Sequence, residues 1–219
     1  MKRVLITGAG GFVGSRVLQQ WQGKYELCAF PKGFLCTATE MEVLAQTRAR
    51  DPDVILHTAA LSDTGYCAQH PAEQRVLELC PDSVHLRASW MYDLPGYGLP
   101  IRGNLPLNLL RAALKGEAVR FSRNDFRGVT YVRQVIENLE PAMDLPGGVY
   151  NFGSGNAEDM VCTARQFAKA LGITVKIAEE SWERNLVMDA AKLERSGIRF
   201  AATQQGIRCC LQDYGLSDL

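Results

Sequence analysis

Short apolar runs alternate along the chain with stretches in which apolar residues recur at helical spacing. The runs predict strands, and the first of them is suited to a parallel strand that is covered on both faces. The strands predicted in this way cover residues 4–6, 25–30, 54–58, 84–90, 119–122, 148–152 and 175–178.

Helices are predicted between these strands. Thr39 and Glu42 form a capping-box pattern before a helix expected at 40–50, and Pro52 breaks that helix. The other helices are predicted to follow Gly14 and to cover residues 72–80, 107–115, 131–139, 161–171 and 189–196. Because strands and helices alternate, we expect an α/β fold built on a doubly wound parallel sheet, the Rossmann arrangement.

A glycine-rich loop joins the first strand to the first helix. Gly8 can take the positive φ of a tight turn, Gly11 lets a pyrophosphate approach the backbone, and Gly14 lets the helix pack close to the sheet. Phe12 and Val13 stand at the start of that helix, where free N–H groups and the helix dipole favour phosphate. The loop therefore predicts dinucleotide binding, and a turn without a ligand is the alternative.

The residues after the second strand indicate which dinucleotide is bound. An acidic residue that binds the ribose is expected about twenty residues beyond the glycines. This part of the chain reads Ala29-Phe30-Pro31-Lys32 and holds no carboxylate. Lys32 could meet a 2′-phosphate instead, so we expect NADP, with NAD as the alternative. A solvated turn lysine is the other interpretation of Lys32.

Composition excludes several classes of partner. Lys plus Arg and Asp plus Glu number 24 each, so the net charge is zero and nothing favours nucleic acid or an anionic membrane. The seven cysteines include no Cys-x-x-Cys pair, which argues against a metal and favours reduced thiols. The first strand begins at once, leaving no room for a signal peptide. We therefore expect a cytoplasmic protein.

Several segments together carry a family pattern. Besides the glycine loop they are residues 51–60 (DPDVILHTAA), Cys67 with His70-Pro71, residues 86–92 (LRASWMY), Gly103-Asn104, residues 130–132 (TYV) and residues 148–153 (GVYNFG). In this pattern the chain resembles the extended short-chain dehydrogenase/reductases, and within them the dTDP-4-dehydrorhamnose reductases and the NAD-dependent epimerase family. The resemblance implies a dinucleotide and a nucleotide sugar as ligands.

The resemblance also implies site residues. It places Thr58, Ala59 and Ala60 at the cofactor. Ser62 follows, where the family has substrate and ribose contacts. The residues that align with the region closing on the sugar nucleotide are Arg87, Asn104, Arg127 and Thr130. We expect His57 to pack beside the cofactor rather than to act as a general base.

The family's catalytic pair is missing from this chain. Relatives use a Tyr-x-x-x-Lys pair in which the lysine lowers the pKa of the tyrosine, and no tyrosine here has a lysine four residues further on. The chain passes at residues 71–79 from the start of one family helix into the end of another. We therefore expect a sheet shortened by one central strand–helix unit, a Rossmann core at 1–95, and small α/β substrate-lobe elements at 96–219.

Two functions remain open at this stage. The first is an NAD(P)-binding protein related to nucleotide-sugar reductases, with impaired or no catalysis. The second is an active NADP(H)-dependent reductase or epimerase of a nucleotide sugar whose catalytic segment is absent from this sequence. No catalytic residue can be assigned, and the oligomeric state stays open.

Overall fold

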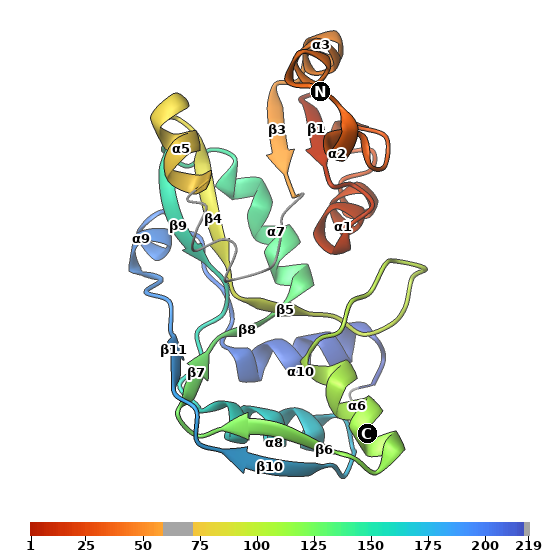
Figure 1. The fold of residues 1–219 in the computed structure, drawn as a ribbon, viewed down its shortest axis with the longest axis vertical. Coiled ribbons are helices and arrows are strands. Elements are labelled where there is room, and N and C mark those ends of the chain that lie inside the picture. Colours follow the sequence, from red (N-terminus) through yellow and green to blue (C-terminus); the bar gives the residue numbers. More distant parts are fainter. Residues whose placement is uncertain (59–71, 217–219) are drawn as a thin grey trace. The chain divides into compact units, whose positions relative to one another are not determined.

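The computed structural model describes residues 1–58 and 72–216 (Figure 1). The chain forms two compact units that interleave along the sequence. Unit 1 comprises Met1–Arg75 with Gly96–Pro100, and unit 2 comprises Val76–Pro95 with Ile101–Leu219. The boundary between residues 95 and 96 stays a prediction, because these units follow spatial contacts rather than one cut in the chain.

Unit 1 is built on a three-stranded parallel sheet. Its strands are β1 (Arg3–Thr7), β2 (Glu26–Ala29) and β3 (Val54–His57), in the order β2-β1-β3. The central strand is the most buried of the three, with Val4, Leu5 and Ile6 at most 1% exposed, as its apolar run predicts. The helices of this unit are α1 (Phe12–Gln20), α2 (Phe34–Thr37) and α3 (Glu40–Arg50).

The strand β3 is an edge strand of this sheet. In the part of the chain that the structure describes, it pairs with β1 alone. Its burial is only partial, and the Ile55 side chain is 54% exposed. The apolar run at 54–58 would suit a buried strand, and this expectation is wrong, because no described strand continues the sheet beyond β3.

In its described residues, unit 2 contains four two-stranded parallel sheets and several helices. The helix α5 (Ala72–Leu79) crosses the division between the units. The strands are β4 (Val84–Ala88), β5 (Trp90–Tyr92), β6 (Ala118–Ser122), β7 (Asp125–Arg127), β8 (Val129–Tyr131), β9 (Gly148–Phe152), β10 (Lys176–Glu180) and β11 (Arg184–Leu186). The helices are α6 (Leu105–Lys115), α7 (Val132–Ala142), α8 (Met160–Ala170), α9 (Ala191–Arg195) and α10 (Thr203–Asp213).

These strands pair in parallel as β4-β9, β5-β8, β10-β6 and β11-β7. Helix α8 packs against β6 and β10, and α10 packs against β8 (Figure 1). Between them lies a core in which Tyr92 stacks on Tyr131 and meets the edge of Phe167. The fold is therefore α/β with parallel strands, as the alternation of elements predicts.

The sheet is shortened as the sequence predicts. Among described residues, β3 of unit 1 pairs with β1 alone and β4 of unit 2 pairs with β9 alone. Both are therefore edge strands. Within residues 1–58 and 72–216, every sheet lies inside one unit and no strand pairing joins the two.

Candidate functional site

The glycine loop of unit 1 has the geometry of a tight strand-to-helix turn. Gly8 has a φ of 69°, a conformation that favours glycine, and its carbonyl accepts a hydrogen bond from the Gly11 N–H at 2.8 Å. Gly11 then caps the N-terminus of α1, whose first residues are Phe12 and Val13. A Cβ at Gly10 would meet nothing within 4 Å, so the tip of the loop leaves open space.

Gly14 marks the closest approach of α1 to the sheet. A Cβ at this position would lie 2.4 Å from the Gly8 carbonyl oxygen and 2.8 Å from the Thr58 hydroxyl. Thr58 donates its hydroxyl to the Thr7 carbonyl at 2.6 Å, so it ties the ends of β3 and β1 together. Only glycine fits at position 14 without a shift of the backbone.

His57 ends β3 beside this loop. Its Nδ1 lies 2.7 Å from the Thr7 hydroxyl, and its side chain is exposed. Lys32 is exposed in the turn after β2, close in sequence to Phe30, whose ring packs against Phe34 and lies under the Arg50 guanidinium. The predicted Ala59, Ala60 and Ser62 lie outside the described residues.

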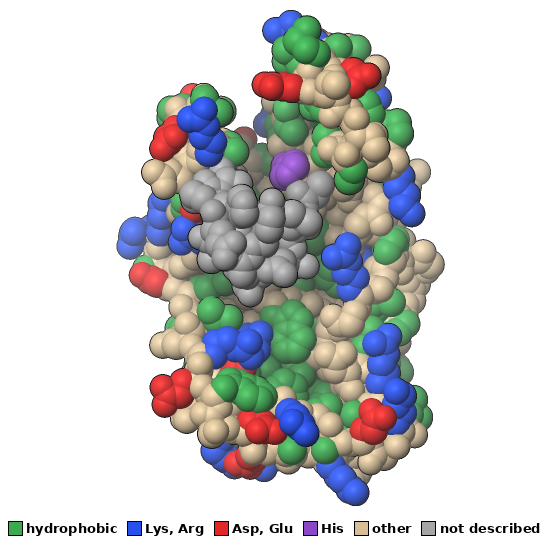
Figure 2. Space-filling view, viewed as in Figure 1, with side chains coloured by type: hydrophobic (Ala, Val, Ile, Leu, Met, Phe, Trp, Pro, Cys, Tyr) green, Lys and Arg blue, Asp and Glu red, His purple; other side chains and the backbone are tan. Residues whose placement is uncertain are grey.

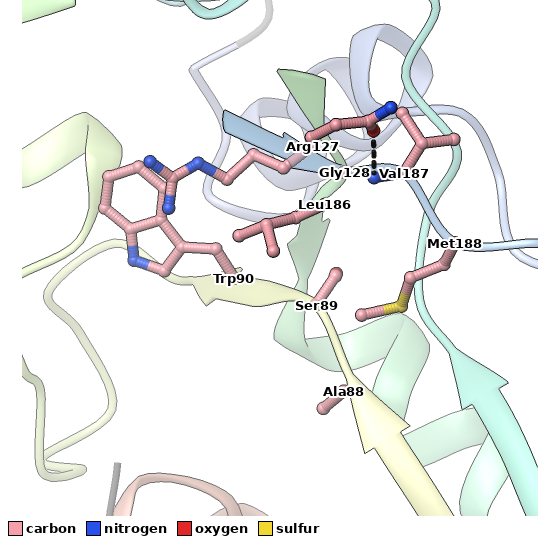
Figure 3. Close-up of a pocket in the computed structure, with 9 residues that line it drawn as sticks. Ala88, Ser89, Trp90, Arg127, Gly128, Leu186, Val187 and Met188 are labelled. Carbon is pink, nitrogen blue, oxygen red and sulfur yellow. Dashed lines mark hydrogen bonds between the residues drawn. The ribbon is translucent and has the colours of Figure 1, made fainter. Parts of the chain in front are cut away.

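Unit 2 contains a cavity of about 390 Å³, which we call the Trp90 pocket. Its walls come from the junction of β4 with β5, from the end of β7, and from β11 with the residues after it. The lining residues are Ala88, Ser89, Trp90, Arg127, Gly128, Asn185, Leu186, Val187 and Met188 (Figure 3). An indole ring, aliphatic side chains and one guanidinium are groups that suit an aromatic ligand carrying negative charge.

Arg127 is the cationic group of this pocket. Its guanidinium lies over the Trp90 ring, 5.0 Å from the ring centroid (Figure 3). It donates to the Asp125 carboxylate at 2.9 Å, while its Nε is buried without a hydrogen-bond partner. The arginine is therefore oriented by the protein over the Trp90 ring.

Asp125 is a fully buried carboxylate behind the pocket wall. Burial disfavours its charge, but hydrogen bonds from Arg184 and Arg127 outweigh this, so the pKa of Asp125 is lowered. Sequence reasoning did not single out Asp125, Trp90 or the β11 wall. The alternation of Asp125 and Arg127 on one strand face was the available signal for the first of these.

Ser89, which lines the pocket, forms a hydroxyl pair with Thr130, which does not. Their oxygens lie 2.5 Å apart, and Thr130 Oγ1 also accepts the Ser154 N–H at 2.7 Å. Thr130 is fully buried. Its hydroxyl therefore fixes Ser89, which lines the pocket, and the predicted substrate contact of Thr130 stays a prediction.

The other predicted substrate residues, Asn104 and Arg87, do not line the Trp90 pocket. Asn104 is 2% exposed, accepts the Leu107 N–H as the cap of α6, and donates to the Asp93 carbonyl. Arg87 is exposed in β4, near the Trp90 pocket in sequence but not among its lining residues. The structure thus places Arg127 in the pocket, and the substrate roles of Asn104 and Arg87 remain predictions.

Two buried tyrosines of unit 2 lack the environment of a proton donor. Burial raises the pKa of Tyr92 well above its usual value, and its hydroxyl has no hydrogen-bond partner. Burial also raises the pKa of Tyr131. A catalytic tyrosine needs the opposite shift, produced by a nearby cation.

Comparison with known proteins starts from the glycine loop. Residues 4–78 match the model of the NAD dependent epimerase/dehydratase family. The predicted family resemblance is confirmed. The matched segment contains β1, the glycine loop and β3. A comparison with curated protein sequences found no match.

Solved structures extend the likeness over nearly the whole chain. A dTDP-4-dehydrorhamnose reductase from Bacillus anthracis, in complex with NADP, is 14% identical with a TM-score of 0.82, covering 97% of this chain and 99% of that chain. A dTDP-4-dehydrorhamnose reductase from Clostridium acetobutylicum has 14% identity, a TM-score of 0.81 and the same coverage.

A UDP-glucose 4-epimerase from Thermus thermophilus, in complex with NAD, is 19% identical with a TM-score of 0.71, covering 97% of this chain and 99% of that chain. The chain thus has the fold of epimerase-family nucleotide-sugar enzymes. At these identities the likeness establishes the fold alone.

Proposed function

We propose that this chain binds NADP(H) at the glycine loop of unit 1 and a nucleotide sugar at the Trp90 pocket of unit 2, with little or no turnover. The single observation that carries the proposal is the intact loop, with its Gly8 turn and Gly14 contact, in a chain without a Tyr-x-x-x-Lys pair. The alternative, an active reductase or epimerase, requires another group to supply the proton.

The cofactor part of the proposal is supported by space, backbone donors and charge. The loop tip is open at Gly10, and the start of α1 presents the N–H groups that favour a pyrophosphate. Lys32 is exposed after β2, where a carboxylate would select NAD. Structures with the same fold hold NADP or NAD. When bound, the nicotinamide would supply hydride chemistry.

The nucleotide-sugar part rests on the Trp90 pocket. Trp90 offers an aromatic face, and Arg127 offers a guanidinium that suits a diphosphate. The raised pKa values of Tyr92 and Tyr131 argue against either as the proton donor. Ligand binding without turnover therefore fits the chemistry of unit 2 better than catalysis does.

Binding and turnover can be tested on the intact chain. We expect NADPH fluorescence to change saturably on titration with the protein, and absorbance at 340 nm to stay constant when dTDP-4-dehydrorhamnose is added. Absence of NADPH binding would overturn the cofactor assignment. Saturable, protein-dependent NADPH oxidation would support the active reductase instead.

The choice of NADP can be tested at Lys32. Replacing Lys32→Gln removes the only charge assigned to the 2′-phosphate, so we expect NADPH affinity to fall about tenfold, near 1.4 kcal/mol. NADH lacks this phosphate and serves as the internal control, with unchanged affinity. An equal loss for both dinucleotides would show that Lys32 does not select NADP.

We also propose that the protein acts in the cytoplasm and has no nucleic-acid partner. No helix among the described residues is long and apolar enough to span a membrane. The described cysteines are all free, which suits a reducing compartment. Acidic and basic side chains are interspersed over the face seen in Figure 2, which offers no continuous basic track for a nucleic acid.

A further inference from the structure

We propose that Asp125 is a positioning residue for the Trp90 pocket: it fixes the Arg127 guanidinium so that this arginine binds the diphosphate of the ligand. The inference rests on the proposed nucleotide-sugar site. Asp125 itself does not line the pocket, so its effect is exerted through the side chains that it holds.

The carboxylate of Asp125 is the meeting point of two arginines from two strands. It is fully buried and accepts from Arg127 of β7 at 2.9 Å and from the Nε of Arg184 of β11 at 3.1 Å. A second nitrogen of Arg184 also donates to it, making that pair bidentate, and the Trp182 indole N–H lies 3.5 Å away. Bidentate pairs restrict orientation as well as adding energy.

The register of the two strands shows what this carboxylate holds in place. Asp125 lies opposite Arg184, and Arg127 lies opposite Leu186. Arg127 and Leu186 both line the pocket. Asp125 therefore holds Arg127 of β7 directly. Through its cross-strand pair with Arg184 it also holds β11, the strand that carries Leu186.

The arginine that Asp125 holds keeps binding capacity for a ligand. One guanidinium nitrogen of Arg127 is committed to Asp125, while its Nε is buried without a partner and its plane covers Trp90. Two guanidinium groups share one carboxylate, so the cluster retains a net positive charge. A diphosphate next to Trp90 would meet this positive charge.

Positioning and simple charge predict opposite effects of one substitution. Asp125→Asn removes a negative charge near the pocket, so charge alone predicts tighter binding of an anion. If Asp125 positions Arg127, the same change frees the guanidinium and weakens anion binding. The sign of the change therefore separates the two explanations.

The test compares dTDP with thymidine, which has no phosphate, by calorimetric titration of the intact chain. We expect Asp125→Asn to raise the Kd for dTDP at least tenfold and to leave the Kd for thymidine within twofold. The matched control is Glu179→Gln, because Glu179 also bridges two arginines, Arg123 and Arg165, at a surface outside the pocket. This control should bind both ligands as the unaltered chain does.

A second variant keeps the test decisive if Asp125→Asn does not fold. Arg184 is 41% exposed, and Arg184→Gln leaves the bond between Asp125 and Arg127 intact. We expect an intermediate loss of dTDP affinity with thymidine unchanged. Unchanged or tighter dTDP binding, or an equal loss for both ligands, would overturn the positioning role. Failure of the unaltered chain to bind dTDP would overturn the proposed nucleotide site itself.

Discussion

Single atoms decide the geometry of the glycine loop. A Cβ at Gly14 would meet backbone atoms of Gly8 and Ala9 at 2.4 and 2.9 Å, and backbone cannot rotate away as a side chain can. We expect Gly14→Ala to lower the free energy of unfolding by about 1–3 kcal/mol and to abolish NADPH binding. Urea unfolding and NADPH titration would measure the two effects.

The matched control lies in the same loop. A Cβ at Gly10 meets nothing within 4 Å, so Gly10→Ala should leave the free energy of unfolding within about 0.5 kcal/mol. If both substitutions cost the same stability, the close approach at Gly14 is not what requires glycine there.

The Asp125 carboxylate predicts a dependence of stability on pH. The pKa of Asp125 is lowered in the native state. Its contribution to the free energy of unfolding is therefore fully present above the unfolded-state pKa of about 3.9, and it is lost as pH falls through the lower native-state pKa. Asp125→Asn leaves two arginines without their buried partner and should cost about 3 kcal/mol at pH 7. In urea unfolding, this difference should stay constant from pH 7 to 5 and shrink below pH 4.

The comparison at pH 7 is again Glu179→Gln, whose carboxylate is more exposed than that of Asp125. Exposed ion pairs contribute little to stability, so the loss should be smaller. A difference between unaltered chain and Asp125→Asn that grows as pH falls would contradict the assigned sign.

At the scale of elements, α3 depends on its own termini. None of its residues is buried, so packing contributes little to it, and Thr39 and Glu42 form a complete capping box. We expect Thr39→Ala to lower the free energy of unfolding by about 1 kcal/mol. Thr37→Ala is the control, because Thr37 is also exposed and its hydroxyl makes only a 3.5 Å bond to Phe34.

Both variants are compared by thermal unfolding followed by circular dichroism. Equal losses would mean that the hydroxyl at position 39 has no special role as a cap. The result also bears on prediction from sequence, because the capping box is a local signal that located α3 without any knowledge of the fold.

Elements whose signals are not local were predicted less well. The run at 84–90 reads as one strand, but the structure divides it into β4, which pairs with β9, and β5, which pairs with β8. The division at Ser89 depends on partners about 40 and 65 residues away in the chain. The short strands β7 and β11 were not predicted, because three residues carry too little periodicity.

At the scale of the whole molecule, none of the sheets that the structure describes crosses between the two units. Cooperative unfolding is expected only where packing couples the parts of a chain. We therefore expect two transitions in urea. Trp21 reports unit 1, while Trp90 and Trp182 report unit 2, so the variants Trp21→Phe and Trp90→Phe/Trp182→Phe separate the two by fluorescence.

A ligand should shift only the transition of the unit that binds it. NADPH at 100 times its Kd should stabilise the Trp21 transition by about 2.7 kcal/mol and leave the other unchanged. A single transition with the same midpoint in both variants would show that the units unfold together.

The sequence by itself determined the features that depend on neighbours in the chain. The glycine spacing, the capping box at Thr39, the alternation of strands and helices, and the missing Tyr-x-x-x-Lys pair could all be seen without coordinates, because each reflects local backbone geometry or residue identity. The same local reasoning placed Lys32 after β2 and identified the family resemblance.

Only the tertiary structure decided which distant residues meet. Asp125 joins Arg184 across 59 positions of sequence, and Trp90 meets Arg127 through the pairing of β5 with β8 next to β7. It also decided that β3 is an edge among the described strands, with Ile55 exposed, although its residues are apolar enough for a buried strand. Burial depends on what packs against a segment, and local sequence does not specify that partner.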